Sequence, residues 1–318
     1  MEGGKVMIMR NWTVPMEENL LKGHVACQGC LGALAMRLML KGLGTNVAVV
    51  IPACCWTIIS GDVLYHALKV PVFHTAFETA AITATGVKAG LTMRGKGDTT
   101  VLAWAGDGGT FDIGLQAISG AAERNEDIIY AVYDNEAYMN TGIQRSSATP
   151  YGAWTTTTPA KRPEDKPKKD IVEILAAHRV PYVAAVTPAY PEDFLRKVEK
   201  AKKIKGFRFF HILSPCPPGW KMPSDYSVQA ARLAVQTKVF PLLEIENGEK
   251  YTINYEYPKD VPLDEYLKLQ GRFKHLFKTP EKIEHIKEQV KKRWEYLLMR
   301  HKLTHGTTDN IVRKVFYK

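Results

Sequence analysis

The sequence predicts an α/β fold built on a doubly wound, mostly parallel sheet, followed by a helical C-terminal arm. Short apolar runs that suit buried strands alternate with segments of helical periodicity over most of the chain. This alternation is typical of a parallel sheet with helices on both faces. After residue 239 the sequence becomes more charged and more helical. We therefore predict an α/β domain at residues 1–239 and an arm at residues 240–318, which packs on partner subunits or on itself as a helical pair.

The predicted strands are continuous apolar runs, as expected where a parallel sheet is covered on both faces. Val47–Ile51 is followed by Pro52, and further strands are expected at 100–105, 128–134, 182–186 and 207–213. The first helix is predicted over Leu31–Leu43, because its leucines recur on one face. Further helices are expected at 76–93, 113–124, 171–177 and 191–203.

Two later segments complete the predicted order. Asn135–Asp170 lacks a helical or strand pattern, and loops of this length in compact domains are usually functional or bound by partners. In the arm, Asn247 and Gly248 favour a hairpin turn. Charged helices are then expected at 264–277 and 280–301.

The most informative motif follows two neighbouring predicted strands. The strand at 100–105 runs into Gly106-Asp107-Gly108-Gly109, and the next ends at Asp134-Asn135. Parallel strands would bring Asp107 and Asn135 together at their carboxyl ends, where open α/β sheets bind ligands. Their oxygens suit Mg²⁺, and the glycines let backbone N–H groups approach a diphosphate. An ordinary strand–turn–helix would explain Gly-Asp-Gly alone, but with Asn135 the spacing matches the thiamine diphosphate signature and predicts a diphosphate-side domain.

The five cysteines indicate a second site. Cys27 and Cys30 form a C-x-x-C pair, Cys54 and Cys55 are adjacent, and Cys216 stands alone. A zinc knuckle, a redox disulfide and an iron–sulfur site all use C-x-x-C pairs. An odd count, with no signal peptide in Met1–Arg10, argues against a disulfide framework. Adjacent side chains diverge, so one of Cys54 and Cys55 would join a four-thiolate site, which suits a [4Fe–4S] cluster somewhat better than zinc.

Together these motifs resemble one family, the β subunits of 2-oxoacid:ferredoxin oxidoreductases, and most of all those of pyruvate:ferredoxin oxidoreductase (pyruvate synthase). The resemblance is carried by Gly-His-Val-Ala-Cys-Gln-Gly-Cys, by Ala-Gly-Asp-Gly-Gly-Thr-Phe-Asp and by Tyr-Asp-Asn-Glu-Ala-Tyr-Met-Asn-Thr-Gly. It spans the segments 23–30, 77–81, 105–114, 133–157 and 266–276.

The resemblance implies a role for each candidate residue. Cys27, Cys30, Cys55 and Cys216 would ligate one [4Fe–4S] cluster, where Cys55 is preferred to Cys54 by alignment to the following Trp56-Thr57-Ile58. Asp107, Asn135 and the carbonyl of Ala137 would hold Mg²⁺. Gly106, Gly108, Gly109 and His24 would contact thiamine diphosphate, and Asn140 and Thr141 would face the diphosphate or the substrate as catalytic residues. Glu78 is interpreted as structural, because the activating glutamate of this family resembles one on another subunit.

The resemblance also implies a reaction and partners. The reaction is reversible, coenzyme A-dependent oxidative decarboxylation of pyruvate to acetyl-CoA and CO₂, with electrons passed to ferredoxin. A pyrimidine-binding α subunit and a ferredoxin-like cluster subunit are expected, because this chain contains neither part. Other 2-oxoacids (branched-chain, 2-oxoglutarate or oxalate), a non-redox thiamine lyase or synthase, and a zinc-stabilised scaffold remain alternatives.

Composition is consistent with a cytoplasmic enzyme subunit. The net charge is +10 over 318 residues, but the lysines are spread along the chain without a nucleic-acid-binding motif. No apolar run approaches the roughly 20 residues of a membrane span. Neither nucleic acid nor a membrane is therefore expected as a partner. The positive charge suits a solvated surface, or a docking face for an acidic protein.

Overall fold

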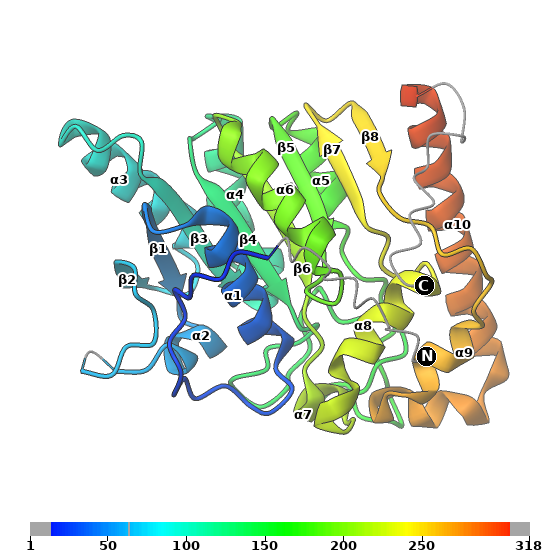
Figure 1. Ribbon diagram of the computed structural model, residues 1–318. Helices are drawn as coiled ribbons and strands as arrows, with labels where there is room; N and C mark the ends of the chain where they lie inside the picture. The colour runs from blue at the N-terminus through cyan, green and yellow to red at the C-terminus, as the bar shows by residue number, and fades with distance from the viewer. Residues whose placement is uncertain (1–13, 63, 306–318) are drawn as a thin grey trace, which may run out of the picture.

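The computed structural model describes residues 14–62 and 64–305, shown as ribbons in Figure 1. The leading segment Met1–Arg10, for which no signal peptide is predicted, lies outside the described residues. In the described part no helix combines the length and apolar character that crossing a membrane requires.

The centre of the molecule is an eight-stranded sheet with the order β2-β1-β3-β4-β6-β5-β7-β8. Six neighbouring strands are parallel, whereas β7 runs antiparallel to β5 and β8 runs antiparallel to β7. The parallel strands are β1 (Val47–Pro52), β2 (Val72–Thr75), β3 (Thr100–Gly106), β4 (Ile129–Asp134), β5 (Tyr182–Val186) and β6 (Arg208–Leu213). The antiparallel pair is β7 (Leu243–Glu246) and β8 (Lys250–Ile253). The predicted mostly parallel sheet is confirmed.

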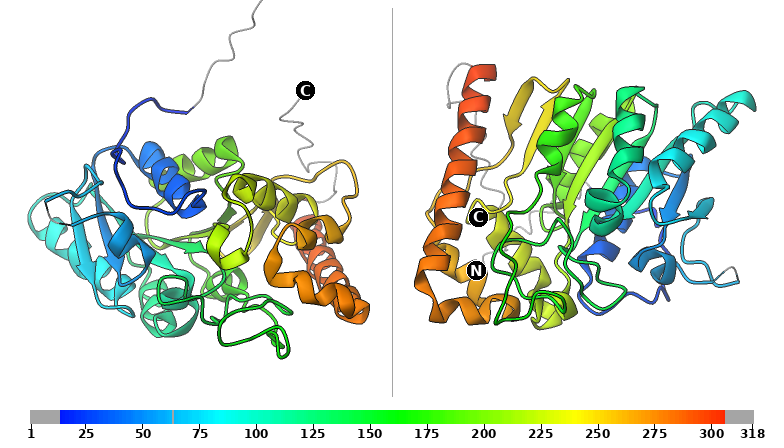
Figure 2. Two further views of the ribbon diagram at one scale, coloured as in Figure 1. Left: turned by 90° about the horizontal axis from the view of Figure 1, so that it is seen from below. Right: turned by 180° about the vertical axis from the view of Figure 1, so that it is seen from behind.

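Helices cover both faces of this sheet, and the two views of Figure 2 show the two layers. One face carries α1 (Leu31–Leu43) and α6 (Pro191–Lys203); the other carries α3 (Ala80–Met93), α4 (Leu115–Glu123) and α5 (Ile171–Ala177). Successive residues of β3 pack on opposite faces of the sheet: Leu102 and Trp104 on the α1 side, and Ala103 on the α3 side. A strand buried on both faces accounts for the continuous apolar runs in the sequence.

Some elements differ from the sequence prediction. The short elements β2, α2 (Cys55–Ile59), α7 (Pro217–Trp220) and α8 (Ser227–Gln236) were not anticipated. The helix predicted at 264–277 is divided into α9 (Leu263–Lys268) and a 3₁₀ helix at Gly271–Lys278. A Cβ atom at Gly271 would lie 2.7 Å from the carbonyl oxygen of Lys221. The predicted helix is therefore interrupted where the backbone passes close to the end of α7, a close approach that glycine allows.

The described part of the predicted arm is continuous with the α/β domain. Its hairpin, β7 and β8, extends the same sheet, and α10 (Pro280–His305) lies along β8 (Figure 1). Trp294 and Leu297 of α10 belong to the same core as β5 and α5. The segment therefore packs on its own chain, and its contact with partner subunits stays a prediction.

Candidate functional site

The carboxyl ends of β3 and β4 bring together most of the residues predicted for cofactor binding. Gly106 pairs with Tyr133 in the sheet register, so Asp107 and Asn135 leave the sheet side by side. A cavity of about 220 Å³ opens between them. Its walls include Gly106, Asp107, Gly108, Gly109, Asn135, Ala137, Asn140 and Thr141, together with Cys54, Cys55, Phe77, Tyr133, Tyr138 and Met139.

The three predicted magnesium ligands, Asp107, Asn135 and Ala137, all line this cavity. One terminal atom of the Asn135 amide lies 3.0 Å from Asp107 Oδ1 and 2.9 Å from the carbonyl oxygen of Ala137. With the amide nitrogen in that place, the side chain donates to both oxygens; with the amide oxygen there, three oxygens face one another. Adjacent ligands of an octahedral Mg²⁺ stand about 3 Å apart, because each lies roughly 2.0–2.1 Å from the metal. The two distances from Asn135, to Asp107 and to Ala137, therefore match those between adjacent ligands of this cation.

Ser146, which the sequence reasoning missed, orients the aspartate. Its hydroxyl donates to Asp107 Oδ2 at 2.6 Å, so the other carboxylate oxygen is the one directed at Asn135. Burial, followed by the nearby Asp134 carboxylate, raises the pKa of Asp107 well above its usual range. A bound cation would favour the ionised form instead. No sequence signal distinguishes Ser146 from the other hydroxyl residues of the loop.

The glycine turn after β3 packs tightly against the loop after β4. A Cβ atom at Gly108 would lie 2.3 Å from the ring of Tyr138, so only glycine lets that ring cover the turn. The Tyr138 hydroxyl donates to Asp112 Oδ2 at 2.7 Å and fixes the ring there. The turn that carries Asp107 and the loop that carries Asn135 are thus held together by direct contact.

The adjacent cysteines face different neighbours. Burial, and then the thiols of Cys54, Cys216 and Cys30, raise the pKa of Cys55 to about 12. Burial raises the pKa of Cys216 to about 12, with Cys30 and Cys27 contributing. For Cys54, burial raises the pKa while a hydrogen bond with Tyr133 opposes the shift. Cys55 is therefore the member of the pair whose thiol interacts with Cys216 and Cys30, two of the other three predicted ligands.

The cysteine thiols influence one another's pKa values but are not arranged as a metal-binding group. Among residues 14–62 and 64–305, no group of three or more His, Cys, Asp or Glu side chains is arranged to hold a metal ion. Cys27 is exposed and lines an open pocket with Pro217, Pro218 and Lys221.

The remaining predicted residues lie at the rim or elsewhere. Asn140 and Thr141 are exposed at the mouth of the cavity, and the Thr141 hydroxyl donates to Gln144 Oε1 at 2.6 Å. His24 is not among the residues that line the cavity; its Nδ1 accepts from the Ala26 N–H at 3.4 Å. Glu78 is exposed and also lies outside the cavity walls.

A buried charge network flanks Asn135 on both sides and was not predicted. Asp134 Oδ2 lies 2.7 Å from His211 Nε2 and 2.5 Å from Lys168 Nζ. Lys168 also contacts Glu136 Oε1 at 2.7 Å, and Arg272 contacts Glu136 Oε2 at 2.5 Å. Although burial alone would raise it, Lys168 and His211 lower the pKa of Asp134 to about 2. Asp134, directly before the predicted metal ligand, is therefore held in its ionised form.

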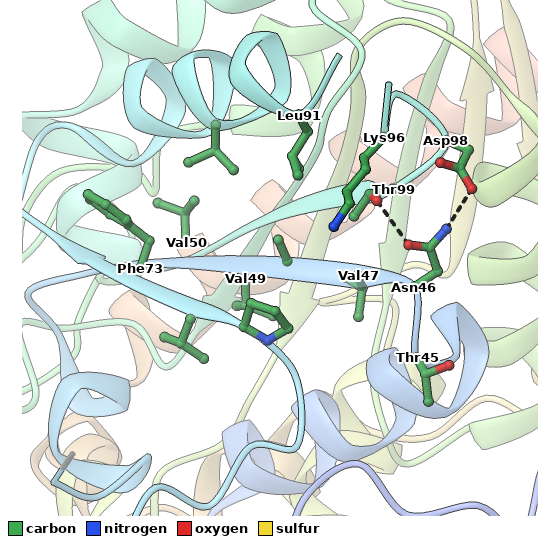
Figure 3. A pocket seen from close by; sticks show the side chains of 14 residues that line it. Thr45, Asn46, Val47, Val49, Val50, Phe73, Leu91, Lys96, Asp98 and Thr99 are labelled. Atoms are coloured by element: carbon green, nitrogen blue, oxygen red, sulfur yellow. Dashed lines mark hydrogen bonds between the residues drawn. The ribbon is translucent and has the colours of Figure 1, made fainter. Parts of the chain in front are cut away.

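A second pocket, of about 580 Å³, lies at the opposite end of the sheet (Figure 3). It is mostly apolar, and its polar rim is satisfied internally: Asn46 donates to Asp98 at 2.9 Å and accepts from Thr99 at 2.9 Å. It surrounds the amino-terminal end of β1, whereas Asp107 follows the carboxyl end of β3. This pocket is therefore separate from the candidate site.

Comparison with known proteins agrees with this geometry. Residues 60–212 match the thiamine pyrophosphate enzyme, C-terminal TPP binding domain. The chain is 52% identical over 300 residues to ketoisovalerate oxidoreductase subunit VorB of Pyrococcus horikoshii, an alignment that covers 91% of this chain and 96% of the relative. The chain belongs to the β subunits of the 2-oxoacid:ferredoxin oxidoreductases.

Other members of this β-subunit family are similar over comparable lengths. Pyruvate synthase subunit PorB of Methanocaldococcus jannaschii is 48% identical over 293 residues, covering 89% of this chain and 97% of the relative. The fold also matches 2-oxoglutarate:ferredoxin oxidoreductase from Magnetococcus marinus, a structure with 2-oxoglutarate, coenzyme A and succinyl-CoA bound. That match has a TM-score of 0.55 at 21% identity and covers 71% of this chain and 82% of the other.

Proposed function

We propose that this β subunit binds thiamine diphosphate, Mg²⁺ and one [4Fe–4S] cluster in a coenzyme A-dependent pyruvate:ferredoxin oxidoreductase. The observation that carries the proposal is the cavity at the carboxyl ends of β3 and β4. There Asp107, Asn135 and Ala137 converge at magnesium spacing, and Cys55 lines the same cavity. An anchored diphosphate and a neighbouring thiolate site are what a decarboxylation linked to electron transfer requires.

Each predicted residue has a task in this proposal. Asp107, Asn135 and the Ala137 carbonyl hold Mg²⁺, and the backbone of Gly106, Gly108 and Gly109 faces the diphosphate. Asn140 and Thr141 face the diphosphate or the substrate at the cavity mouth. His24 does not line the cavity, and it contacts the part of the cofactor that extends beyond it. Cys27, Cys30, Cys55 and Cys216 hold the cluster. When bound, thiamine diphosphate supplies the electron sink for loss of CO₂ from a 2-oxoacid.

The proposed assembly contains more than this chain. A pyrimidine-binding α subunit completes the cofactor site, a ferredoxin-like subunit receives electrons from the cluster, and ferredoxin and coenzyme A act as acceptor and co-substrate. The proposed location is the cytoplasm. The open pocket beside Cys27 is the side from which a redox partner would approach.

A branched-chain 2-oxoacid is the second candidate substrate. The three ketoisovalerate oxidoreductase subunits are each 52% identical to this chain, whereas the pyruvate synthase subunits are 43–48% identical. This difference favours a substrate with a larger side chain. The sequence blocks around 138–154 and 266–276 favour pyruvate.

The test is a substrate panel on the anaerobically assembled complex. Reduction of ferredoxin or methyl viologen is followed with pyruvate, 2-oxoisovalerate, 2-oxoglutarate and oxalate, with and without coenzyme A. The highest kcat/KM with pyruvate supports the proposal, and preference for 2-oxoisovalerate replaces pyruvate with the second candidate. A colourless complex without absorbance near about 400 nm, or with zinc in place of iron, overturns the iron–sulfur assignment.

A further inference from the structure

We propose that Trp220 and Arg272 are positioning residues that join the metal-binding loop and the Cys216 segment into one rigid unit. The identity of the two bound groups rests on the function proposed above. The joining itself rests on contacts among residues 135–139, 216–220 and 272. Neither the sequence motifs nor the comparisons assign a role to Trp220 or to Arg272.

Trp220 links the two segments directly. Its indole is fully buried, and Nε1 donates to the backbone carbonyl of Asn135 at 2.8 Å. Its own backbone N–H donates to the carbonyl of Cys216 at 2.8 Å. One residue therefore bonds the backbone of a proposed metal ligand and the backbone of a proposed cluster ligand.

The two segments also pack without space between them. A Cβ atom at Gly219 would lie 2.2 Å from Met139 Sδ and 3.6 Å from Cys216 Sγ. The short helix that follows Cys216 is thus pressed against the loop that carries Asn135 and Ala137. A displacement of either segment would be transmitted to the other.

Arg272 clamps this contact from the C-terminal segment. Its guanidinium carbon lies 3.8 Å from the centre of a Trp220 ring, and its Nη2 contacts Glu136 Oε2 at 2.5 Å. Its Nε donates to Gln270 Oε1 at 2.9 Å, and the side chain is almost fully buried. A planar guanidinium can stack and form an ion pair at the same time, which a lysine ammonium cannot do.

The clamp acts where the metal loop needs support. Glu136 adopts a left-handed backbone conformation with φ of 69°, and on either side of this turn the Asn135 amide and the Ala137 carbonyl oxygen lie 2.9 Å apart. A non-glycine residue keeps that conformation only when its surroundings hold it. Glu136 is held by Arg272, by Lys168, and through its carbonyl by the Thr149 hydroxyl at 2.8 Å.

The test uses Trp220→Phe and Arg272→Lys in the assembled complex. The first variant keeps an aromatic ring for Arg272 but removes the Nε1 donor; the second keeps the charge but removes the planar stack. Matched controls are Trp294→Phe, a buried tryptophan of α10, and Arg300→Lys, whose guanidinium stacks on Tyr251 at 4.3 Å. Thiamine diphosphate affinity is measured at fixed Mg²⁺, and the reduced complex is examined by electron paramagnetic resonance with its iron content.

We expect both variants to weaken thiamine diphosphate binding about tenfold, as removal of groups that orient metal ligands usually does. The resonance spectrum of the reduced cluster changes in the same two variants while iron content stays at the wild-type level. Both controls keep the wild-type spectrum and bind the cofactor within about twofold of wild type. A melting temperature close to wild type shows that the effect is local rather than a general loss of folding.

Two results would overturn the inference alone: wild-type cofactor affinity in Trp220→Phe and Arg272→Lys, or weakened affinity with an unchanged cluster spectrum. An equal effect in the controls also overturns it, because the change is then one of general stability. A wild-type complex that contains neither thiamine diphosphate nor iron overturns the proposed function, and the inference with it.

Discussion

At the scale of single residues, the aspartate after β3 carries the largest predicted effect. Replacing Asp107 by Ala removes the one charged oxygen of the convergent trio. We expect thiamine diphosphate affinity to fall at least about a hundredfold, while cluster iron stays at the wild-type level. Cofactor content of the purified complex measures this. Asp98→Ala, in the separate pocket of Figure 3, is the control, and normal cofactor retention by Asp107→Ala would contradict the metal site.

Ser146 offers a milder and more specific change. Ser146→Ala removes the donor that holds Asp107 Oδ2 at 2.6 Å, so the carboxylate is no longer fixed with its other oxygen toward Asn135. We expect the Mg²⁺ concentration needed for half-maximal cofactor binding to rise about tenfold. Titration with Mg²⁺ at saturating cofactor tests this. Ser119→Ala, which removes a hydroxyl on α4, should leave the titration unchanged.

Alanine variants of the adjacent residues Cys54 and Cys55 serve as controls for each other. The thiol of Cys55 interacts with those of Cys216 and Cys30, whereas Cys54 bonds with Tyr133. We expect Cys55→Ala, like Cys27→Ala, to lose cluster iron, and Cys54→Ala to retain it. Iron and sulfide analysis of anaerobic preparations measures the difference, and the reverse result would exchange the roles of the two neighbours.

At the scale of elements, Glu244 joins its own strand β7 to β5, to α6 and to the residue that follows β8. It accepts from Tyr182 of β5 at 2.6 Å, from Arg196 and Lys200 of α6 at 3.0 and 3.1 Å, and from Asn254 beyond β8 at 2.6 Å. Burial opposes ionisation, but Lys197, Tyr182, Arg196 and Lys200 lower the pKa of Glu244 to about 2. The hairpin is therefore attached to the parallel sheet by a buried carboxylate that must be ionised.

This attachment predicts a pH dependence of stability. Because the folded-state pKa lies below the unfolded value, Glu244 stabilises the fold fully above about pH 4.5 and loses that contribution as pH falls toward about 2. The contribution is on the order of 3 kcal/mol at neutral pH. Glu244→Gln should have a smaller free energy of unfolding at pH 7 and a flatter dependence between pH 5 and pH 3. Exposed Glu199→Gln is the control, and denaturant unfolding is the measurement; equal slopes for both variants would contradict the assignment.

The elements that could be predicted are those whose own sequence determines them. Val101–Ala105 of β3 and Ile129–Tyr133 of β4 are continuous apolar runs because both faces of these strands are buried, and the apolar residues of α1 recur with the helical period. β2, at the edge of the sheet, has two half-buried and two exposed residues and carries neither pattern. The break at Gly271 depends on the carbonyl of Lys221, which no local window contains.

The same distinction holds within the candidate site. Asp107 and Asn135 could be predicted because each directly follows a strand, and parallel neighbours bring strand ends together. Ser146, Trp220 and Arg272 could not, because their contacts join residues 39, 85 and 136 positions apart. Their residue types carry no signal until the fold has placed them.

At the scale of the whole molecule, the described residues leave the candidate cavity open, because Asn140 and Thr141 are exposed at its mouth. The proposed α subunit would cover the thiamine ring there. We expect the purified chain to turn over no 2-oxoacid and the complex to reduce methyl viologen with pyruvate and coenzyme A. A steady-state assay before and after adding the partner subunits checks this, and activity of the chain by itself would contradict its assignment as a subunit.

Arg272 follows Glu136 by 136 residues, so the loop that carries Asn135 and Ala137 is synthesised well before Arg272. All six parallel strands are translated before Arg272 emerges, so they can pair while the turn at Glu136 still lacks this partner. The sheet can therefore be assembled during translation, whereas the clamped form of the cofactor loop is completed only near its end. The proposed role of Arg272 therefore predicts that cofactor loading follows synthesis of the C-terminal segment, although the loop itself is encoded in the first half of the chain.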